Sequence, residues 1–230
     1  MAEQWWPLST NAGGEDASLM LLERLAHDLR GPLSPLQTAA YLLRRDDVEA
    51  ERRVELLEII ERQTTRLSAM VQEVSDWTRA RQSRLVEHRR PVGASLLVEL
   101  GCAPAGPTVQ LDLPETLDTA MVDGDAQRLV QMLSTLVGFM QAKVGDSGLS
   151  VRASMADNAL GVVIEAPGVT WAEGERESLF KQAQVAPFDE GLGMRLLLAQ
   201  AIARAHGGAV DVGETSADGA CLHVRLPLAT

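Results

Sequence analysis

The chain has 230 residues, a net charge of −11, and a composition of 46% hydrophobic and 23% charged residues, which is typical of a globular protein. The negative charge disfavours a protein whose main task is to bind nucleic-acid phosphates. The longest apolar runs are shorter than the roughly 18 residues of a membrane span, and the N-terminus lacks the basic and apolar regions of a signal peptide. We therefore expect a cytoplasmic protein with no membrane span and with protein partners.

Residues 1–15 combine Trp5-Trp6-Pro7 with small polar residues and predict an irregular N-terminal arm. Two helices are predicted next, over residues 16–44 and 48–85, joined by a charged turn at residues 45–47. Their apolar positions recur in steps of three and four, at Leu22, Leu25, Leu29, Leu33, Leu36, Ala40 and Leu43, and then at Leu57, Ile60, Thr64, Leu67, Val71, Val74 and Thr78. One hairpin over residues 16–88 cannot cover these stripes, so we expect a homodimeric four-helix bundle.

His27 lies inside the first helix but outside its apolar stripe. At about 100° per residue it is offset by about 200° from both Leu25 and Leu29, which points the imidazole toward solvent. Asp28 follows directly, and a carboxylate beside an imidazole can accept its N–H and raise the basicity of the other nitrogen. This pair is the predicted chemical site. His88, His206 and His223 lack comparable neighbours, and His206-Gly207-Gly208 indicates the end of a helix.

After a linker at residues 89–91, residues 92–230 change to mixed strands and helices. Helices are predicted over residues 92–100, 123–144, 173–183 and 194–205. Strands are predicted over residues 109–113, 149–155, 160–165, 209–213 and 220–226, with a turn at Asp157-Asn158. A sheet covered on one face by helices, a two-layer α/β sandwich, is the simplest packing. Cys102 and Cys221 have no metal-ligand spacing, so we expect buried free thiols and no metal site.

The segment His27-Asp28-Leu29-Arg30-Gly31-Pro32-Leu33 resembles the H-box of bacterial sensor histidine kinases. The resemblance implies that His27 is the phospho-acceptor and Asp28 its acid/base partner. In that family a Thr or Asn four residues after the histidine supports dephosphorylation. Gly31 stands there in this chain, so phosphatase activity is not expected.

The second half resembles the ATP-binding domain of the same kinases, but with altered nucleotide positions. The resemblance is carried by Asp125–Leu133, Gly191-Leu192-Gly193-Met194, residues 205–208 and Leu226-Pro227-Leu228. The family's two asparagines fall on Thr135 and Phe139, and a phenyl ring cannot ligate magnesium. The family's adenine-binding Asp and first Gly fall on Ile164 and Ala166; another register would offer Glu165 instead.

These departures imply a degenerate domain with no tightly bound cofactor. The expected function is a histidine phosphotransfer protein that relays a phosphoryl group between receiver-domain aspartates through His27. The expected partners are receiver domains of response regulators or hybrid kinases, which supply the magnesium. Two alternatives stay open. One is a divergent but active autokinase that uses Glu165 and either Gln131 or Gln141, and the other is a non-catalytic pseudokinase scaffold that binds a receiver or a kinase.

Overall fold

The computed structural model describes residues 14–45, 47–145, 148–184, 191–214 and 219–229. The predicted arm with Trp5-Trp6 lies outside these residues. The chain divides into two compact units. The first contains residues up to 75 together with 182–194, and the second contains residues 76–181 and 195 onward. None of the described helices is both long and apolar enough to cross a membrane.

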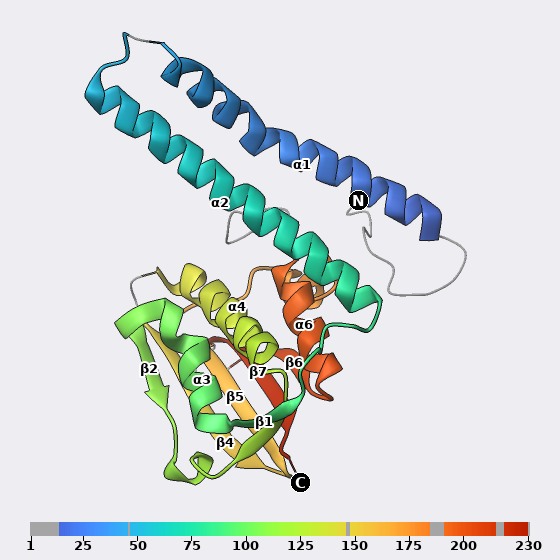
Figure 1. Ribbon diagram of the computed structural model, residues 1–230. Coiled ribbons are helices and arrows are strands. Elements are labelled where there is room, and N and C mark those ends of the chain that lie inside the picture. The colour runs from blue at the N-terminus through green and yellow to red at the C-terminus, as the bar shows by residue number, and fades with distance from the viewer. Residues whose placement is uncertain (1–13, 46, 146–147, 185–190, 215–218, 230) are drawn as a thin grey trace. The chain divides into compact units, whose positions relative to one another are not determined.

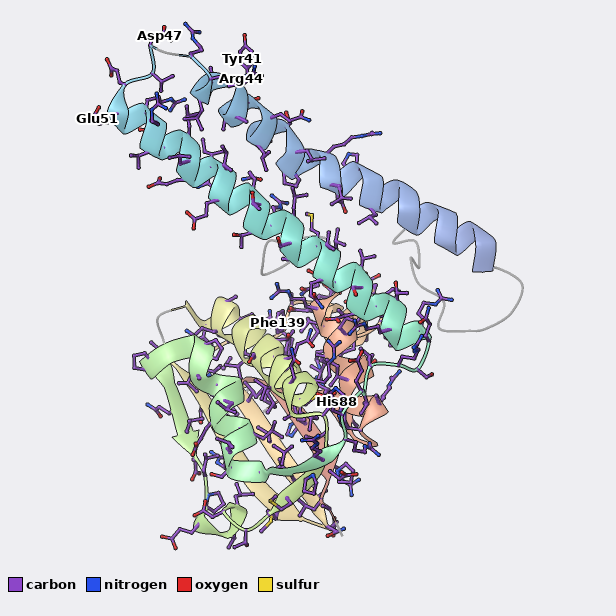
Figure 2. The ribbon with its side chains drawn as sticks, viewed as in Figure 1. Tyr41, Arg44, Asp47, Glu51, His88 and Phe139 are labelled. Carbon is purple, nitrogen blue, oxygen red and sulfur yellow. The ribbon has the colours of Figure 1, made fainter. Side chains whose placement is uncertain are left out.

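The first unit contains the predicted helical hairpin up to residue 75, and the last turns of the second helix belong to the second unit. Helix α1 (Gly14–Leu43) and helix α2 (Ala50–Arg81) lie side by side in Figure 1. Helix α2 carries Glu51 in its first turn and Arg79 and Arg81 in its last turn, charges that favour the two ends of the helix dipole. The connection is polar, and Figure 2 shows Arg44 and Asp47 beside it, where Asp47 forms an exposed ion pair with Arg45.

The apolar stripe of the hairpin is only partly covered within one chain. Ala39, Leu56 and Met70 are buried, but Leu57 and Val71 on the predicted stripe of α2 are 52% and 63% exposed. Burying apolar side chains of this size stabilises a protein by about 1.5–3 kcal/mol each. Among the residues that the structure describes, part of the apolar face of the hairpin therefore stays exposed.

The second unit is a five-stranded sheet with helices on one face (Figure 1). The strand order is β2-β4-β5-β7-β6, in which β2 pairs parallel to β4 and the other neighbours are antiparallel. The strands are β2 (Val109–Asp112), β4 (Leu149–Ala156), β5 (Ala159–Ala166), β6 (Ala209–Glu214) and β7 (Ala220–Pro227). The covering helices are α3 (Ala94–Cys102), α4 (Ala126–Val144) and α6 (Arg195–Ala205).

The interior of the second unit follows the periodicities of the sequence. Leu129, Met132 and Leu136 of α4 are completely buried, in steps of three and four, and alternate residues of β5 are buried in steps of two. Asp157 and Asn158 adopt φ values of 50° and 56°, which makes the predicted tight turn between β4 and β5. The predicted two-layer α/β arrangement is confirmed.

Several predictions on local structure were wrong. The helix predicted over residues 123–144 begins at Ala126. The segment predicted as a linker at residues 89–91 enters strand β1 (Arg90–Gly93), which pairs antiparallel with an unpredicted strand β3 (Met121–Gly124). The helix predicted over residues 173–183 is reduced to α5 (Glu175–Ser178). The helix predicted over residues 92–100 begins two residues later, because residues 92 and 93 belong to β1.

The prediction that both thiols are buried is confirmed for Cys102 and Cys221, and the Cys221 Sγ atom lies 3.2 Å from Nε2 of His223. Burial raises the pKa of Cys102 to about 11, because the thiolate loses its hydration. A thiol that stays protonated at neutral pH is a poor nucleophile. Cys102 is thus a core residue.

His206 has a structural role at the end of α6. Its Nε2 accepts the backbone N–H of Asp125 at 3.0 Å, and its Nδ1 donates to the Ile202 carbonyl at 2.8 Å, so the ring is neutral and its tautomer is defined by its partners. Burial lowers the pKa of His206 below its ordinary value of 6.5.

This lowered pKa makes stability depend on pH. At neutral pH the ring is neutral in both the folded and the unfolded chain. As pH falls below about 6.5 the unfolded chain takes up the proton first, so the free energy of unfolding decreases with falling pH until the folded-state pKa is passed. We expect urea titrations to show this slope in the wild type and in His88→Gln, which alters an exposed ring, and to show it reduced in His206→Gln. An unchanged slope in His206→Gln would contradict the assignment.

Candidate functional site

The candidate site on the first unit is the His27–Asp28 pair on α1. The His27 side chain is 83% exposed, as its offset from the apolar stripe predicts. Its Nδ1 lies 3.2 Å from Oδ1 of Asp28. An imidazole that donates Nδ1–H to a carboxylate keeps its lone pair on Nε2, so Nε2 is the nitrogen available as a nucleophile. The two residues that the sequence singled out therefore lie within hydrogen-bonding distance of each other.

A cavity of about 550 Å³ adjoins this pair within the first unit. It combines the imidazole with two cationic side chains, Arg30 and Arg66, and the Arg66 Nε atom is buried with no hydrogen-bond partner among the described residues. The cavity is lined by His27, Asp28, Arg30, Gly31, Ser34, Arg66, Met70, Gln184, Gly191 and Leu192. Its cations favour an anionic group beside the histidine. The sequence did not predict Arg66 as part of this site, because it lies on the other helix of the hairpin.

The two α4 positions that replace the family's asparagines differ in their surroundings. Thr135 is partly exposed. Phe139 is 3% exposed, and its ring stacks on Trp171 with centroids 6.4 Å apart; Figure 2 shows it on α4. The ammonium of Lys143 lies 5.6 Å from the Phe139 ring and 5.2 Å from the Trp171 ring, and it pairs with Glu175 at 2.7 Å. An aromatic cluster closed by an ion pair occupies this part of α4, and its donor set does not suit magnesium.

Strand β5 positions the residues that replace the adenine-binding box. Ile164 and Ala166 are both completely buried. Glu165 lies between them, and because successive side chains of a strand point to opposite faces, it lies on the other face. There it is 3.7 Å from Arg152. Glu165 therefore lies on the face of the sheet opposite to Ile164 and Ala166.

The glutamines considered as substitute ligands have other partners. Gln131 binds Arg128 and Asp76, with both distances 2.8 Å. Gln141 donates to the Gly145 carbonyl at 2.7 Å, at the C-terminal end of α4. Both amides thus serve local structure.

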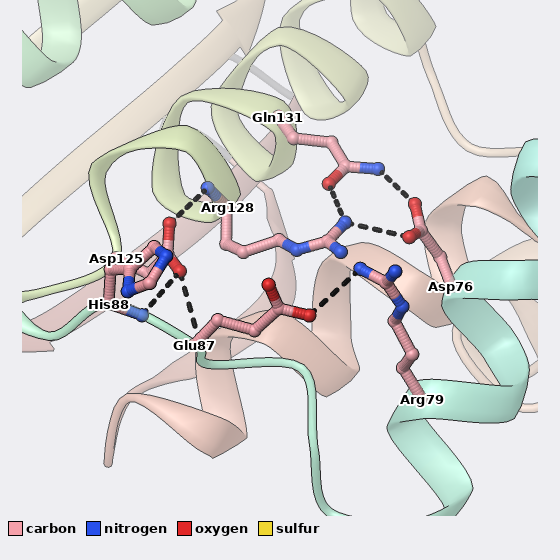
Figure 3. A network of polar contacts seen from close by, with 7 residues as sticks. All are labelled: Asp76, Arg79, Glu87, His88, Asp125, Arg128 and Gln131. Carbon is pink, nitrogen blue, oxygen red and sulfur yellow. Dashed lines mark hydrogen bonds and ion pairs between the residues drawn. The ribbon is translucent and has the colours of Figure 1, made fainter.

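The polar network in Figure 3 joins the last turns of α2 to the start of α4, all within the second unit. Arg128 donates to Asp76 at 2.8 Å, and Asp76 is 1% exposed. Asp125 caps α4 by accepting the N–H of Arg128, and it also accepts the N–H groups of Glu87 and His88. Burial alone would raise the pKa of Asp125, but these N–H donors outweigh it and lower the pKa. The sequence did not predict this network.

Residues 191–194 form the third element of the candidate site. Backbone N–H groups of Leu192 and Met194 donate to the carboxylate of Glu73 on α2. Backbone N–H groups that follow glycines at the start of a helix can bind an anion. The anion that they contact is a side chain of the same chain.

Comparison with known proteins gives the family. Residues 18–83 match the His Kinase A (phospho-acceptor) domain. Residues 124–230 match the family described as histidine kinase-, DNA gyrase B-, and HSP90-like ATPase. The chain is similar to the adaptive-response sensory kinase SasA of Synechococcus sp. (strain JA-3-3Ab). The two are 28% identical over a match that covers 90% of this chain and 59% of SasA.

Solved structures show the same architecture. Full-length ShkA in complex with AMPPNP has 25% identity and a TM-score of 0.65, covering 90% of this chain and 46% of that one. The histidine kinase ThkA, in complex with the response regulator protein TrrA, has 17% identity and a TM-score of 0.68, covering 90% of this chain and 61% of ThkA. This chain spans less than two thirds of each of the three proteins. It belongs to the histidine kinase family, with a phospho-acceptor hairpin that carries His27 followed by an ATPase-like α/β domain.

Proposed function

We propose that this chain relays a phosphoryl group between receiver-domain aspartates through His27, without charging His27 from its own ATP. The observation that carries the proposal is the contrast between its two halves. His27 is exposed and lies within hydrogen-bonding distance of Asp28, while Phe139, where the family places a magnesium-binding asparagine, is buried in an aromatic cluster.

The acceptor chemistry needs few groups from this chain. The lone pair of His27 Nε2 attacks the phosphorus of an aspartyl phosphate; the new N–P bond forms as the P–O bond breaks, and the aspartate leaves as a carboxylate. In this proposal Nδ1 keeps its proton throughout and shares it in a hydrogen bond with the Asp28 carboxylate. The phosphorylated ring carries a positive charge that the Asp28 carboxylate stabilises. Transfer to a second receiver reverses these steps.

The receiver supplies the remaining groups in this proposal. A receiver domain brings its own aspartate and magnesium, so this chain provides an exposed nucleophile and a docking surface. ThkA was solved in complex with a response regulator protein, which supports receivers as partners of this fold. The 83% exposure of the His27 side chain leaves room for a docked protein.

The proposal also includes a homodimer. The exposed stripe on α2, with Val71 63% exposed, supports pairing of two hairpins into a four-helix bundle. A single copy would leave this apolar face in water. The dimer stays a prediction, which sedimentation velocity of the chain would check.

An active autokinase is the second candidate, favoured by the kinase names of the relatives. SasA is named a sensory kinase, and ShkA was solved with AMPPNP. In this chain the aromatic cluster at Phe139 and the buried Ile164 argue against the same nucleotide contacts. The two candidates differ in one measurable property, which is nucleotide binding.

The decisive experiment is titration of the whole chain with ATP and magnesium. We expect no binding tighter than about 1 mM by calorimetry, because oxygen ligands for magnesium are replaced by a phenyl ring. Incubation with labelled ATP should leave His27 unlabelled, whereas a pre-phosphorylated receiver should transfer its label. Micromolar ATP binding with labelling of His27 would establish the autokinase instead. Failure to take label from any of a panel of receivers would favour the scaffold.

A further inference from the structure

The loop formed by Gly191-Leu192-Gly193-Met194 has a tightly specified backbone. Gly193 adopts φ +78°, and a Cβ atom there would collide with the backbone carbonyl of Gln184. The Gln184 N–H donates to the Gly193 carbonyl at 3.0 Å. All four residues of the loop are buried. The loop therefore presents its N–H groups in a fixed direction.

Those N–H groups meet the carboxylate of Glu73, which belongs to the same unit. The Leu192 N–H lies 3.1 and 3.2 Å from the two carboxylate oxygens, and the Met194 N–H lies 3.0 Å from Oε2. Glu73 is 3% exposed. A buried carboxylate is stable only when hydrogen bonds replace its water, and such charge-assisted bonds are stronger than neutral ones. The Glu73 carboxylate thus occupies the place at these amides that a bound anionic ligand would take.

Backbone amides in a glycine-rich loop bind phosphate or carboxylate groups through the same N–H donors. One set of donors cannot serve two anions at once, because the anions would overlap and repel each other. We infer that Glu73 is an internal competitor that occupies the anion-binding amides of Leu192 and Met194 and keeps phosphate groups out of this loop. This inference rests on the proposed function and adds a second obstacle to nucleotide binding, independent of Phe139.

The test uses inorganic pyrophosphate as a probe, because its binding does not depend on the adenine contact that the family makes where Ile164 stands in this chain. Amide signals of Leu192 and Met194 are followed by nuclear magnetic resonance in the whole chain. We expect saturable shifts in Glu73→Ala, with an apparent affinity at least about tenfold tighter than in the wild type. Glu58→Ala, which alters an exposed glutamate on the same helix, should behave as the wild type. Because the amide signals of Leu192 and Met194 are followed individually, pyrophosphate binding at this loop is distinguished from binding at Arg30 and Arg66 near His27.

Two results of the pyrophosphate titration would overturn the inference. One is an equal response of the Leu192 and Met194 signals in wild type and Glu73→Ala, and the other is a folded Glu73→Ala whose signals do not respond to pyrophosphate. If Glu73→Ala does not fold, an acid titration of the wild type decides. The two signals should then move together as one carboxylate is protonated, and this movement should be missing in Glu73→Gln. Signals that do not move with pH in the wild type would also overturn it.

Failure of this inference is distinguishable from failure of the proposed function. Tight ATP binding by the wild type would contradict the phosphorelay proposal whatever Glu73 does. A wild type that binds no ATP, combined with a silent Glu73→Ala, would contradict only the role of Glu73.

Discussion

Replacement of His27 by glutamine is expected to abolish phosphoryl acceptance from a phosphorylated receiver, a loss of at least about a hundredfold. Glutamine has no nucleophilic nitrogen, although it is polar and of similar size. The residue is 83% exposed on α1, so the fold should be retained. The measurement is transfer of labelled phosphate to the chain, with acid lability of the label identifying an N–P bond.

The matched control is His88→Gln, which changes a second exposed histidine and should leave transfer intact. Asp28→Asn should slow transfer by about tenfold to a hundredfold, since an amide orients the ring without stabilising its positive charge. Label on the His27→Gln chain at the wild-type rate would remove His27 from the mechanism. An unaffected Asp28→Asn would remove only its acid/base partner.

Replacement of Asp76 by alanine is expected to lower the free energy of unfolding by about 3–5 kcal/mol. Asp76 is 1% exposed and binds Arg128 at 2.8 Å and Gln131 at 2.8 Å (Figure 3). Its removal leaves the guanidinium of Arg128 buried without its carboxylate. Urea unfolding followed by circular dichroism measures the change.

Asp47→Ala is the control for this effect, because it breaks an ion pair whose side chains are both exposed. Exposed pairs contribute little, so its unfolding midpoint should not change. Asp76→Asn should fall between the wild type and Asp76→Ala, since it retains the volume and one acceptor. An Asp76→Ala chain as stable as the wild type would show that water or other side chains satisfy Arg128.

The sequence was most informative where structure depends on near neighbours. The exposure of His27 followed from its angle to Leu25 and Leu29, and the β4–β5 turn followed from Asp157-Asn158. Helical and strand periods are local properties, so they survive into the fold. The two-layer packing followed from the order of these elements.

The errors occurred where distant residues decide the outcome. Strand β1 is four residues long and contains Pro91, so it reads as a linker until its pairing with β3 is known. The segment after Gly174 has helical spacing, but short helices have little stability of their own, and only one turn forms.

The site shows the same limit. Glu73 contacts Leu192 across 119 residues, and Asp76 contacts Arg128 across 52, so neither contact follows from a local pattern. Spacing alone does not show on which face of the sheet a strand residue such as Glu165 lies. The pleat of β5 and the contact with Arg152 place Glu165 on the face opposite to Ile164 and Ala166.

The pairing of β1 with β3 has a practical consequence for dividing this protein into pieces. A fragment starting at residue 92, the boundary that the sequence suggests, would omit the first half of strand β1 and would separate Arg128 from Asp76. Such a fragment would leave part of the edge of β3 unpaired, and the guanidinium of Arg128 would be buried without its carboxylate partner. A fragment that retains the second unit should therefore start upstream of residue 76, within helix α2.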